Sequence, residues 1–370
     1  MTMVTKPRVW AEIDLKAIQH NFSRIARTVK PAEVMAVLKA NAYGLGIDPI
    51  ALALIEAGAF RIGVAELKEA MQIVTTLPVP IQILGSIMKC EIPDIVNAGI
   101  ICPITDYKMG KRISNEACKQ KKKVTCHILI DTGMGRLGIP YPNALNEVKK
   151  IITLPNLYLE GIYSHFPNAN NQHHPKTKEQ LSIFKNLLHD ISDYSFTLIH
   201  IANSDAINNF NNSYFNMVRT GINLYGVFDL QGRRTYNLKP TISLKTRLIA
   251  KRMLPAGYTI GYGCTYTLFH DTIVGTIPAG YADGIPVSSS NSARVLVSGK
   301  ECPIIGRVSM DYITIDLSSA PQAKLGEIVT IIGNSGKKEI TVEDWAKIKQ
   351  SHPYDVICSL GNRVERIYKS

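Results

Sequence analysis

The feature that most constrains the fold is a repeated alternation, between about residues 31 and 226, of short apolar runs and helix-period segments. The runs are apolar at consecutive positions rather than at every second one, which indicates strands that are buried on both faces. Parallel strands covered by helices have this pattern, because each strand is separated from the next by a helix that packs on the sheet. The eight runs are VMAVL (34–38), FRIGV (60–64), IQIL (81–84), IICPI (100–104), VTCHILI (124–130), LYLEGIYSHF (157–166), FTLIHIA (196–202) and FNMVRTGINLYG (215–226).

Eight such runs predict an α/β fold, a closed (β/α)8 barrel of the TIM type. The alternative is a doubly wound open sheet, which normally has fewer strands and a glycine-rich first turn. Beyond residue 236 the pattern changes to alternating strands and tight turns, as in TISLKTRLIAKRML (241–254) and ARVLVSGKECPIIGRVSMDYITIDL (293–317). We therefore expect a barrel domain over residues 1–235 and a mainly β domain over residues 236–370.

The charge of the chain raises the question whether it binds nucleic acid or an anionic membrane. There are 42 lysine and arginine residues against 30 aspartate and glutamate residues, and the formal net charge is +12. The basic residues are spread along the chain, however, and no aromatic residues for base stacking interleave the densest run, Lys119 to Lys123. No stretch of about 18 residues is apolar throughout. We therefore expect neither a nucleic acid nor a membrane as a partner.

Cysteine usage and the N-terminus point to a cytoplasmic protein. The seven cysteines are scattered, with neither a CxxC pair nor histidines at zinc-finger spacing. An odd number of dispersed cysteines is typical of thiols in a reducing compartment, and the first residues lack the apolar segment of a signal peptide. His173 and His174 lie in a polar loop without acidic or thiol ligands beside them, which favours a solvated loop and predicts no metal site.

Residues with chemical potential follow several of the apolar runs. They are Lys39 to Gly44, Asp131 to Arg136, Ser164 and His165, Asn203 and Ser204, and Arg219 to Ile222. In a barrel of this type the reactive groups lie at the carboxyl ends of the strands. A lysine at the barrel mouth is a candidate for Schiff-base chemistry, and backbone N–H groups after strands seven and eight often bind phosphate. Taken singly, Lys39 could be a surface residue, His165 a satisfied strand-end histidine and Arg219 an ion-pair partner. Their shared position favours a functional site, and Ser204 and the Gly221–Ile222 backbone point to a phosphorylated cofactor or substrate.

The segment AVLKANAYGLG (36–46) closely resembles the pyridoxal-phosphate attachment site of the alanine racemases. The resemblance continues in the family order through both predicted domains. It implies a pyridoxal 5'-phosphate cofactor, an enzyme that interconverts L- and D-alanine, and a role in supplying D-alanine for peptidoglycan. The further matching segments are IDTGMGRLG (130–138), GIYSHF (161–166), ANSDA (202–206), VRTGINLYG (218–226), IGYGCTYT (260–267), IPAGYADG (277–284), GRVSMD (306–311) and CSLGNRVERIY (358–368).

The resemblance implies two bases on opposite faces of the substrate. Lys39 would hold the cofactor and act on the Cα–H of D-alanine, and Tyr262 would be the opposite-face base that handles L-alanine. A free tyrosine, with a pKa of about 10, is a poor base near neutrality and must be activated. In the family, the group matching His165 does this through a hydrogen-bond chain to the arginine matching Arg219. Arg219 would face the pyridine nitrogen and, unlike a carboxylate, would not stabilise a protonated ring, which limits side reactions.

The resemblance also implies how cofactor and substrate are held. Arg136 would contact the cofactor phenolate and the substrate carboxylate, with help from the Met310 backbone. Tyr281 and Tyr354 resemble the gate over the pocket. The residues that match the phosphate-binding positions are Tyr43, Ser204, Gly221, Ile222 and Tyr354. Since the family completes its site across a head-to-tail homodimer, Tyr262 and Met310 would come from the partner chain.

Some positions depart from the family pattern or carry no assignment. Some family members have a carbamylated lysine one strand position before IDTGMGRLG, where this chain has Leu129. The carbamate's support of Arg136 is then absent or replaced, for example by a bound anion. The loop NANNQHH (168–174) also lacks the usual acidic pattern. Asp131 and Asp311 receive no role.

Other functions remain as alternatives. A racemase of the same family with a broader range, or one for serine, differs by a single hydroxyl that a pocket discriminates only modestly. Pyridoxal-phosphate decarboxylases of similar architecture normally pair the pyridine nitrogen with a carboxylate, so Arg219 speaks against them. A non-catalytic protein that holds pyridoxal phosphate would resemble the barrel domain alone, so the β domain with Tyr262 speaks against that function.

Overall fold

The computed structural model describes residues 7–234 and 236–370. Residues 1–6, part of the N-terminal segment used above, and residue 235, where the predicted domain boundary falls, lie outside the described residues. The chain forms two compact units that interleave along the sequence. The barrel unit comprises residues 18–42 and 47–238, and the β unit comprises the residues up to Ala17, residues 43–46 and residues 239–370.

Eight parallel strands form the barrel unit. They lie in the orders β10-β2-β3-β4 and β5-β6-β8-β9, and the short strand β7 (Ile139–Pro140) pairs with β6. A parallel bridge between Gln82 and Ile101 joins the two groups on one side. On the other side the N–H of Arg219 donates to the carbonyl of Ala202 at 3.0 Å. The sheet therefore closes, which confirms the predicted (β/α)8 barrel. The strands are β2 (Glu33–Val37), β3 (Arg61–Val64), β4 (Ile81–Ile83), β5 (Cys102–Ile104), β6 (Val124–Asp131), β8 (Leu157–Tyr163), β9 (Leu198–His200) and β10 (Met217–Thr220).

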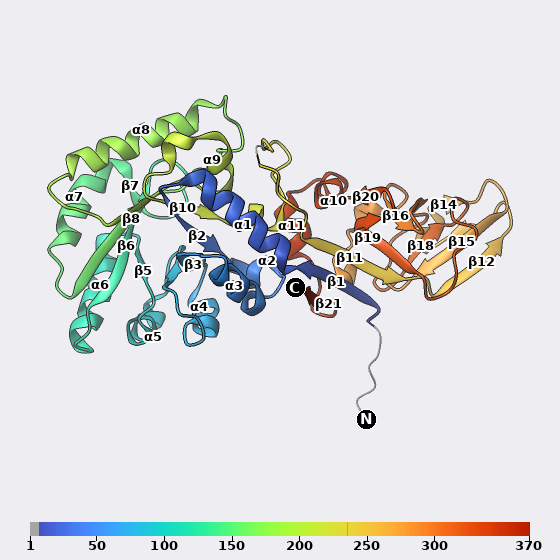
Figure 1. Ribbon diagram of the computed structural model, residues 1–370, viewed down its shortest axis with the longest axis horizontal. Helices are drawn as coiled ribbons and strands as arrows, with labels where there is room; N and C mark the ends of the chain where they lie inside the picture. Colours follow the sequence, from blue (N-terminus) through green and yellow to red (C-terminus); the bar gives the residue numbers. More distant parts are fainter. Residues whose placement is uncertain (1–6, 235) are drawn as a thin grey trace. The chain divides into compact units, whose positions relative to one another are not determined.

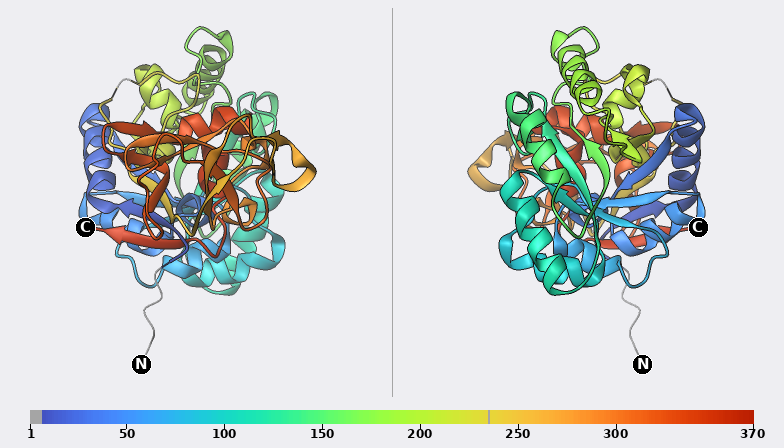
Figure 2. Two further views of the ribbon diagram at one scale, coloured as in Figure 1. Left: turned by 90° about the vertical axis from the view of Figure 1, so that its right-hand side faces the viewer. Right: turned by 90° about the vertical axis from the view of Figure 1, so that its left-hand side faces the viewer.

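Helices surround these strands, as the end-on view of Figure 2 shows. All residues of β3, β4 and β5 are buried, because one face of each strand lies inside the barrel and the other packs against helices. Sequence signals set the helix starts: Asp106 accepts the N–H of Met109 at 2.7 Å before α6, and Pro175 opens α8. The helices in this half of the chain are α1 (Leu15–Val29), α3 (Ile47–Glu56), α4 (Leu67–Ile73), α5 (Ile92–Ala98), α6 (Tyr107–Lys119), α7 (Tyr141–Ile152), α8 (Pro175–Asp190) and α9 (Ser204–Asn209).

The β unit is built on a twisted sheet in the order β17-β16-β19-β11-β1-β21, with β20 paired to β19. Strand β1 (Val9–Asp14), from the start of the chain, lies between β11 and β21 and pairs antiparallel with the first and parallel with the second. A three-stranded sheet β12-β15-β18 and the hairpin β13-β14 complete the mainly β architecture expected from the sequence (Figure 1). The further elements are β11 (Ile242–Arg247), β12 (Ala250–Leu254), β13 (Thr259–Ile260), β14 (Tyr266–Thr267), β15 (Thr272–Ile277), β16 (Arg294–Val297), β17 (Lys300–Pro303), β18 (Ile313–Asp316), β19 (Ile328–Ser335), β20 (Lys338–Ile340), β21 (Glu365–Lys369), α10 (Val342–Lys349) and α11 (Pro353–Cys358).

None of the helices in residues 7–234 and 236–370 combines the length and the apolar character needed to cross a lipid bilayer. All seven cysteines fall within these ranges, and none of them forms a disulfide. Cys102 and Cys126, which are register partners on the neighbouring strands β5 and β6, also keep separate thiols.

Candidate active site

Lys39 begins a left-handed turn at the carboxyl end of β2. Ala40, Asn41 and Ala42 have φ of 54–55° and ψ of 48–51° in the short element α2 (Lys39–Tyr43). Alanine rarely adopts this backbone, which costs about 1–2 kcal/mol per residue, so neighbouring groups must hold it. Glu69 accepts the N–H of Ala40 at 2.5 Å, and the Asn41 side chain accepts the N–H of Ile47 at 2.9 Å. Strained backbone of this kind is concentrated at functional sites.

Arg219 on β10 is buried, being 5% exposed, and it makes four hydrogen bonds inside the barrel unit. Its Nη2 donates to the carbonyls of Ser164 and Ile201 at 2.7 and 3.1 Å. Its guanidinium also contacts the Nδ1 atoms of His165 at 3.1 Å and of His200 at 2.6 Å. Among the described residues no carboxylate pairs with Arg219. Burial lowers the pKa of Arg219 to about 10, so the guanidinium stays charged at neutral pH.

The contact with Arg219 defines the state of His165. A guanidinium has only donors, so Nδ1 of His165 must accept and the ring proton must lie on Nε2. Burial lowers the pKa of His165 well below its ordinary value, and the charges of Arg219, Arg136 and Lys39 lower it further. His165 is therefore a neutral Nε2–H donor. These effects place Arg219, Arg136 and Lys39 each within electrostatic range of His165.

Two short elements of the barrel unit have hydrogen-bond donors at their starts. Ser204 begins α9 and is 5% exposed, and its Oγ accepts the N–H of Gly221 at 3.0 Å. Because Oγ accepts there, its own O–H remains available as a donor. Buried Ile222 begins a 3₁₀ turn (Ile222–Tyr225) directly after Gly221. Hydroxyl and N–H donors at the starts of helical elements suit a phosphate.

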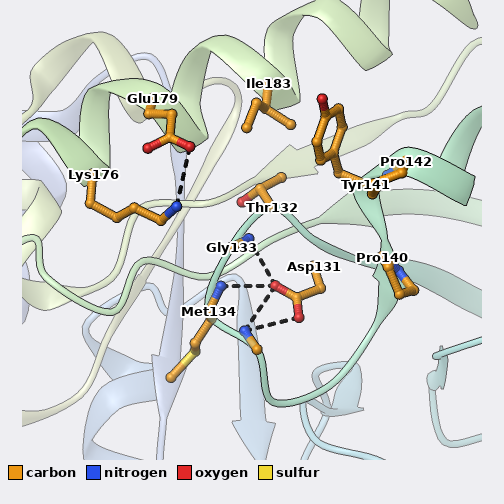
Figure 3. Close-up of a pocket in the computed structure, with 11 residues that line it drawn as sticks. Asp131, Thr132, Gly133, Met134, Pro140, Tyr141, Pro142, Lys176, Glu179 and Ile183 are labelled. Carbon is orange, nitrogen blue, oxygen red and sulfur yellow. Dashed lines mark hydrogen bonds and ion pairs between the residues drawn. The ribbon is translucent and has the colours of Figure 1, made fainter.

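Asp131, which had no role in the sequence analysis, builds the turn that precedes Arg136. Its carboxylate accepts the N–H groups of Gly133, Met134 and Gly135 at 2.8–2.9 Å. Figure 3 shows these bonds at the edge of a pocket of about 350 Å³ between α7 and α8, on the far side of which Lys176 pairs with Glu179 at 3.2 Å. Arg136 itself is exposed.

Leu129 fills the position at which some family members have a carbamylated lysine. It is 4% exposed on β6 and packs against the backbone of Gly138 so closely that a Cβ on Gly138 would lie 2.8 Å from Leu129 Cγ. An apolar side chain thus occupies this position, and Leu129 offers Arg136 no polar support.

Besides Tyr43 and Tyr354, the predicted residues of the β unit fall into two places. Tyr262 begins a 3₁₀ turn (Tyr262–Cys264) and is 73% exposed. Tyr281 and Met310 lie side by side, since the N–H of Tyr281 donates to the Ser309 carbonyl at 3.1 Å and that of Ala282 donates to the Met310 carbonyl at 3.2 Å. Both side chains are about half exposed.

Arg363 holds the segment around Met310 in place, and sequence reasoning missed it. It donates through Nε and Nη2 to the two carboxylate oxygens of buried Asp283 at 2.7 and 3.0 Å. Its Nη1 donates to Asp311 at 2.6 Å, which gives Asp311 a structural role. Arg363, Asp283 and Asp311 lie in three of the segments that match the family. Their opposite charges were the sequence signal that could have predicted this pairing.

Tyr43 and Tyr354, two of the predicted phosphate-binding residues, lie together in the β unit. Their ring centroids are 5.9 Å apart. Burial raises the pKa of Tyr43, and the nearby Cys358 thiol raises it further. Tyr43 is therefore a neutral phenol that can donate a hydrogen bond.

Sequence reasoning also missed a group of buried polar residues behind Arg219. The Tyr163 ring stacks on the His200 ring with centroids 4.7 Å apart and planes inclined by 7°, and Arg219 lies 5.6 Å from the Tyr163 centroid. His127 contacts His200 at 3.0 Å. A signal was present, because His127 and His200 interrupt otherwise apolar runs.

Comparison with known proteins identifies relatives of both units. Residues 13–229 match the family model for the alanine racemase N-terminal domain, and residues 241–368 match that for the C-terminal domain. An alanine racemase of Desulforamulus reducens is 38% identical over 98% of this chain and 99% of its own. One of Halothermothrix orenii is 36% identical over 99% and 98%.

Solved structures agree with these matches. Alanine racemase from D-cycloserine-producing Streptomyces lavendulae has a TM-score of 0.92 at 30% identity, covering 99% of this chain and 98% of that one. The enzyme from Bartonella henselae, with covalently bound pyridoxal phosphate, has a TM-score of 0.90 at 31% identity, covering 98% and 100%.

Proposed function

The chain belongs to the alanine racemase family, and from that premise we propose that it interconverts L- and D-alanine with pyridoxal 5'-phosphate held on Lys39. The observation that carries the proposal is the environment of Arg219, a buried cation without a described carboxylate partner that shares its surroundings with Lys39, Arg136 and His165. An enzyme that moves a single proton without transferring an amino group needs a weak electron sink, which such a cation favours.

The donors of the barrel unit fit the cofactor. Lys39 supplies an amine at a strand end. Ser204 supplies a hydroxyl. The hydrogen bond from Gly221 to Ser204 brings the backbone N–H of the next residue, Ile222, close to that hydroxyl, and the two donors suit the phosphate. The Nε–H and the second Nη1–H of Arg219 make none of the four bonds to described residues, and of these donors we assign the Nε–H to the ring nitrogen. When bound, the cofactor withdraws electrons from the substrate Cα and makes its proton acidic.

Proton transfer in the proposal uses two groups. The Lys39 amine handles the Cα proton of D-alanine, and the Tyr262 phenolate handles that of L-alanine on the opposite face. A racemase needs a donor and an acceptor on each face, so the two must come from different parts of the protein. His165, as a neutral Nε2–H donor, stabilises the deprotonated phenol of Tyr262 by hydrogen bonding.

A homodimer completes the site in this proposal, with Tyr262 and Met310 of the partner subunit facing Lys39. The exposed fractions of 73% for Tyr262 and 52% for Met310 in the single chain support this, since side chains that serve a partner's site are exposed when alone. Arg136 and the Met310 backbone would bind the substrate carboxylate, and Tyr43 and Tyr354 would contribute phenols to the phosphate. Tyr281 and Tyr354 would gate the pocket.

We also propose that the enzyme is cytoplasmic and supplies D-alanine as a precursor of peptidoglycan. Small amino acids are then its only partners besides a second copy of the chain, and the spread of the +12 net charge fits a protein without a nucleic-acid or membrane surface.

The test is formation of D-alanine from L-alanine by the purified holoenzyme, beside L-serine and the Lys39→Ala variant. We expect fast conversion of alanine, slower conversion of serine, and loss of both in the variant together with the absorbance of covalently held cofactor. Faster conversion of serine would identify a serine racemase of the same family. Bound cofactor without racemisation of either amino acid would identify a cofactor-holding protein instead. Unchanged activity of Lys39→Ala would contradict the lysine assignment.

A further inference from the structure

A row of hydrogen-bonded side chains connects Arg219 with a carboxylate on a different barrel strand. Nη1 of Arg219 lies 2.6 Å from Nδ1 of His200, and Nε2 of His200 lies 3.0 Å from Nδ1 of His127. Nε2 of His127 then lies 2.9 Å from Oε2 of Glu160. Both histidines are fully buried, whereas the Glu160 side chain is 18% exposed. The four residues come from β10, β9, β6 and β8.

The row lies inside the barrel. Arg61 on β3 reaches both His127 on β6 and Glu160 on β8, at 3.1 and 2.8 Å. Strands β3 and β6 are not neighbours in the sheet, so side chains from them meet only across the interior. The row therefore runs through the part of the barrel that is closed to solvent at its centre.

One arrangement of protons satisfies every contact along the row, and it leaves only the 3.1 Å contact between Nη1 of Arg61 and Nε2 of His127 without a hydrogen bond. Arg219 can only donate, so Nδ1 of His200 accepts and its proton lies on Nε2. Nδ1 of His127 then accepts from His200, which places the His127 proton on Nε2, where it is donated to Glu160. The reverse order would set two N–H groups against each other at Arg219 and two lone pairs against each other at Glu160.

Arg61 lies at the Glu160 end of the row but is not part of its chain of hydrogen bonds. Its Nη1 faces a His127 nitrogen that already carries a proton, so it donates to Oε1 of Gln82 at 3.1 Å instead. Its Nη2 pairs with Glu160 at 2.8 Å. Burial tends to raise the pKa of Glu160, but the hydrogen bond from His127 and the charge of Arg61 lower it overall, so the terminal acceptor stays a carboxylate.

Both imidazoles in the row are neutral. Burial lowers the pKa of His127 to about 4 and that of His200 well below its ordinary value. For His200 the charge of Arg219 adds to the effect of burial. Each ring can therefore hold its proton on either nitrogen, and which one it chooses depends on the groups at the two ends of the row.

We propose that Glu160 is a positioning residue for Arg219, which fixes the tautomers of His127 and His200 and thereby presents an acceptor to the Arg219 guanidinium. This inference rests on the proposed function, in which Arg219 faces the cofactor ring. Without an acceptor at position 160, His200 is free to take the Nδ1–H form. Its N–H then faces an N–H of Arg219 Nη1, and the repulsion between the two groups displaces the guanidinium.

Two variants separate the role of Glu160 as a hydrogen-bond acceptor for His127 from its role in the ion pair with Arg61. Arg61→Met removes the partner of Glu160 but keeps the acceptor, and Arg61→Met/Glu160→Met removes the acceptor as well without leaving a buried unpaired charge. Glu116→Gln, which breaks the pair with exposed Lys119 on α6, is the control for loss of a carboxylate of similar burial, since the Glu116 side chain is 16% exposed.

The first readout is the ¹⁵N NMR spectrum of histidine-labelled holoenzyme, with signals assigned from His127→Gln and His200→Gln. We expect the Nε2–H form of both rings in the wild type, in Arg61→Met and in Glu116→Gln, and mixed tautomers in the double variant. The second readout is turnover: the double variant should have a kcat for alanine roughly 10-fold to 100-fold below that of Arg61→Met. A larger share of its turnovers should end in pyruvate, with the amino group of alanine left on the cofactor as pyridoxamine 5'-phosphate.

The outcomes distinguish this inference from the function on which it rests. Identical tautomers and identical pyruvate shares in Arg61→Met and the double variant overturn the role of Glu160, even where the wild type racemises alanine. If Glu160 controls the tautomers but the protein racemises no amino acid, the proposed role of Glu160 stands and the proposed function is refuted. If the double variant does not fold, His127→Leu breaks the row while leaving the Glu160–Arg61 pair, and unchanged pyruvate shares in that variant overturn the proposal.

Discussion

Nη2 of Arg219 donates to Nδ1 of His165 across 3.1 Å, and this hydrogen bond decides which imidazole nitrogen carries the proton. The same guanidinium binds His200 and two strand carbonyls, those of Ser164 and Ile201. Arg219 thus organises the ends of three barrel strands at once. Its planar set of donors, and not only its charge, is required for that arrangement.

Arg219→Lys should therefore be far from conservative. A lysine ammonium keeps the charge but has three donors from one atom, so it cannot reach two imidazoles and two carbonyls together. We expect the cofactor to remain on Lys39 and kcat for alanine to fall at least about 100-fold. Steady-state kinetics and the cofactor absorbance measure this, with exposed Arg252→Lys as the control. Wild-type turnover in Arg219→Lys would show that charge alone suffices.

Tyr262→Phe tests the division of labour between the two proposed bases. The variant lacks the phenolic oxygen but keeps the ring of this 73% exposed side chain, so cofactor binding should be unchanged. Exchange of the α-proton of L-alanine in D₂O should slow by about 100-fold or more, and that of D-alanine far less. Proton NMR follows both, and Tyr258→Phe, also an exposed tyrosine, is the control. Equal losses for both enantiomers would argue against two separate bases.

The barrel and the strand-end residues were predictable because they depend on local patterns. Consecutive apolar residues indicate buried strands wherever they occur, and in a barrel each strand end faces the same side. Lys39, His165, Ser204 and Arg219 lie at strand ends for that reason. Each of the eight predicted runs covers one strand of the closed barrel to within one residue.

Other features depend on residues far apart in the sequence and were not predictable. His127 and His200 are 73 positions apart, and their contact follows from the strand order of the closed barrel. Strand β1 lies between β11 and β21, which come from the other end of the chain. The left-handed turn at Ala40 and Ala42 had no signal at all, since alanine disfavours it and only contacts such as that of Glu69 hold it.

The buried histidines predict how stability depends on pH. The fold lowers the pKa of His127 to about 4 and those of His165 and His200 well below the ordinary value, burial being the main cause. In the unfolded chain these groups have a pKa of about 6.5, so below that pH only the unfolded state takes up the protons. The stabilisation is complete above pH 6.5 and is lost as the pH falls towards 4. The free energy of unfolding should decrease by up to about 4 kcal/mol per pH unit, since three protons are involved.

Urea unfolding at pH values from 7.5 to 4.5 measures this slope. His127→Gln should reduce it by about one third, whereas His270→Gln, a change at an exposed position, should leave it as in the wild type. A slope unaffected by His127→Gln would mean that His127 is already protonated in the folded state.

Gly280→Ala should separate the two segments that carry Tyr281 and Met310. A Cβ at position 280 would lie 2.3 Å from the carbonyl oxygens of both Ser309 and Met310, and neither backbone group has room to move without losing the bonds from Tyr281 and Ala282. We expect a lower melting temperature and a fall in kcat/KM for alanine of about 100-fold, as the substrate carboxylate loses its partner. Gly99→Ala, at a position with φ of 70° and nothing within 4 Å of the new Cβ, adds only backbone strain of about 1 kcal/mol. It should therefore lower stability while leaving kcat/KM unchanged, and a Gly280→Ala enzyme with the same kinetics as Gly99→Ala would remove Met310 from the proposed substrate site.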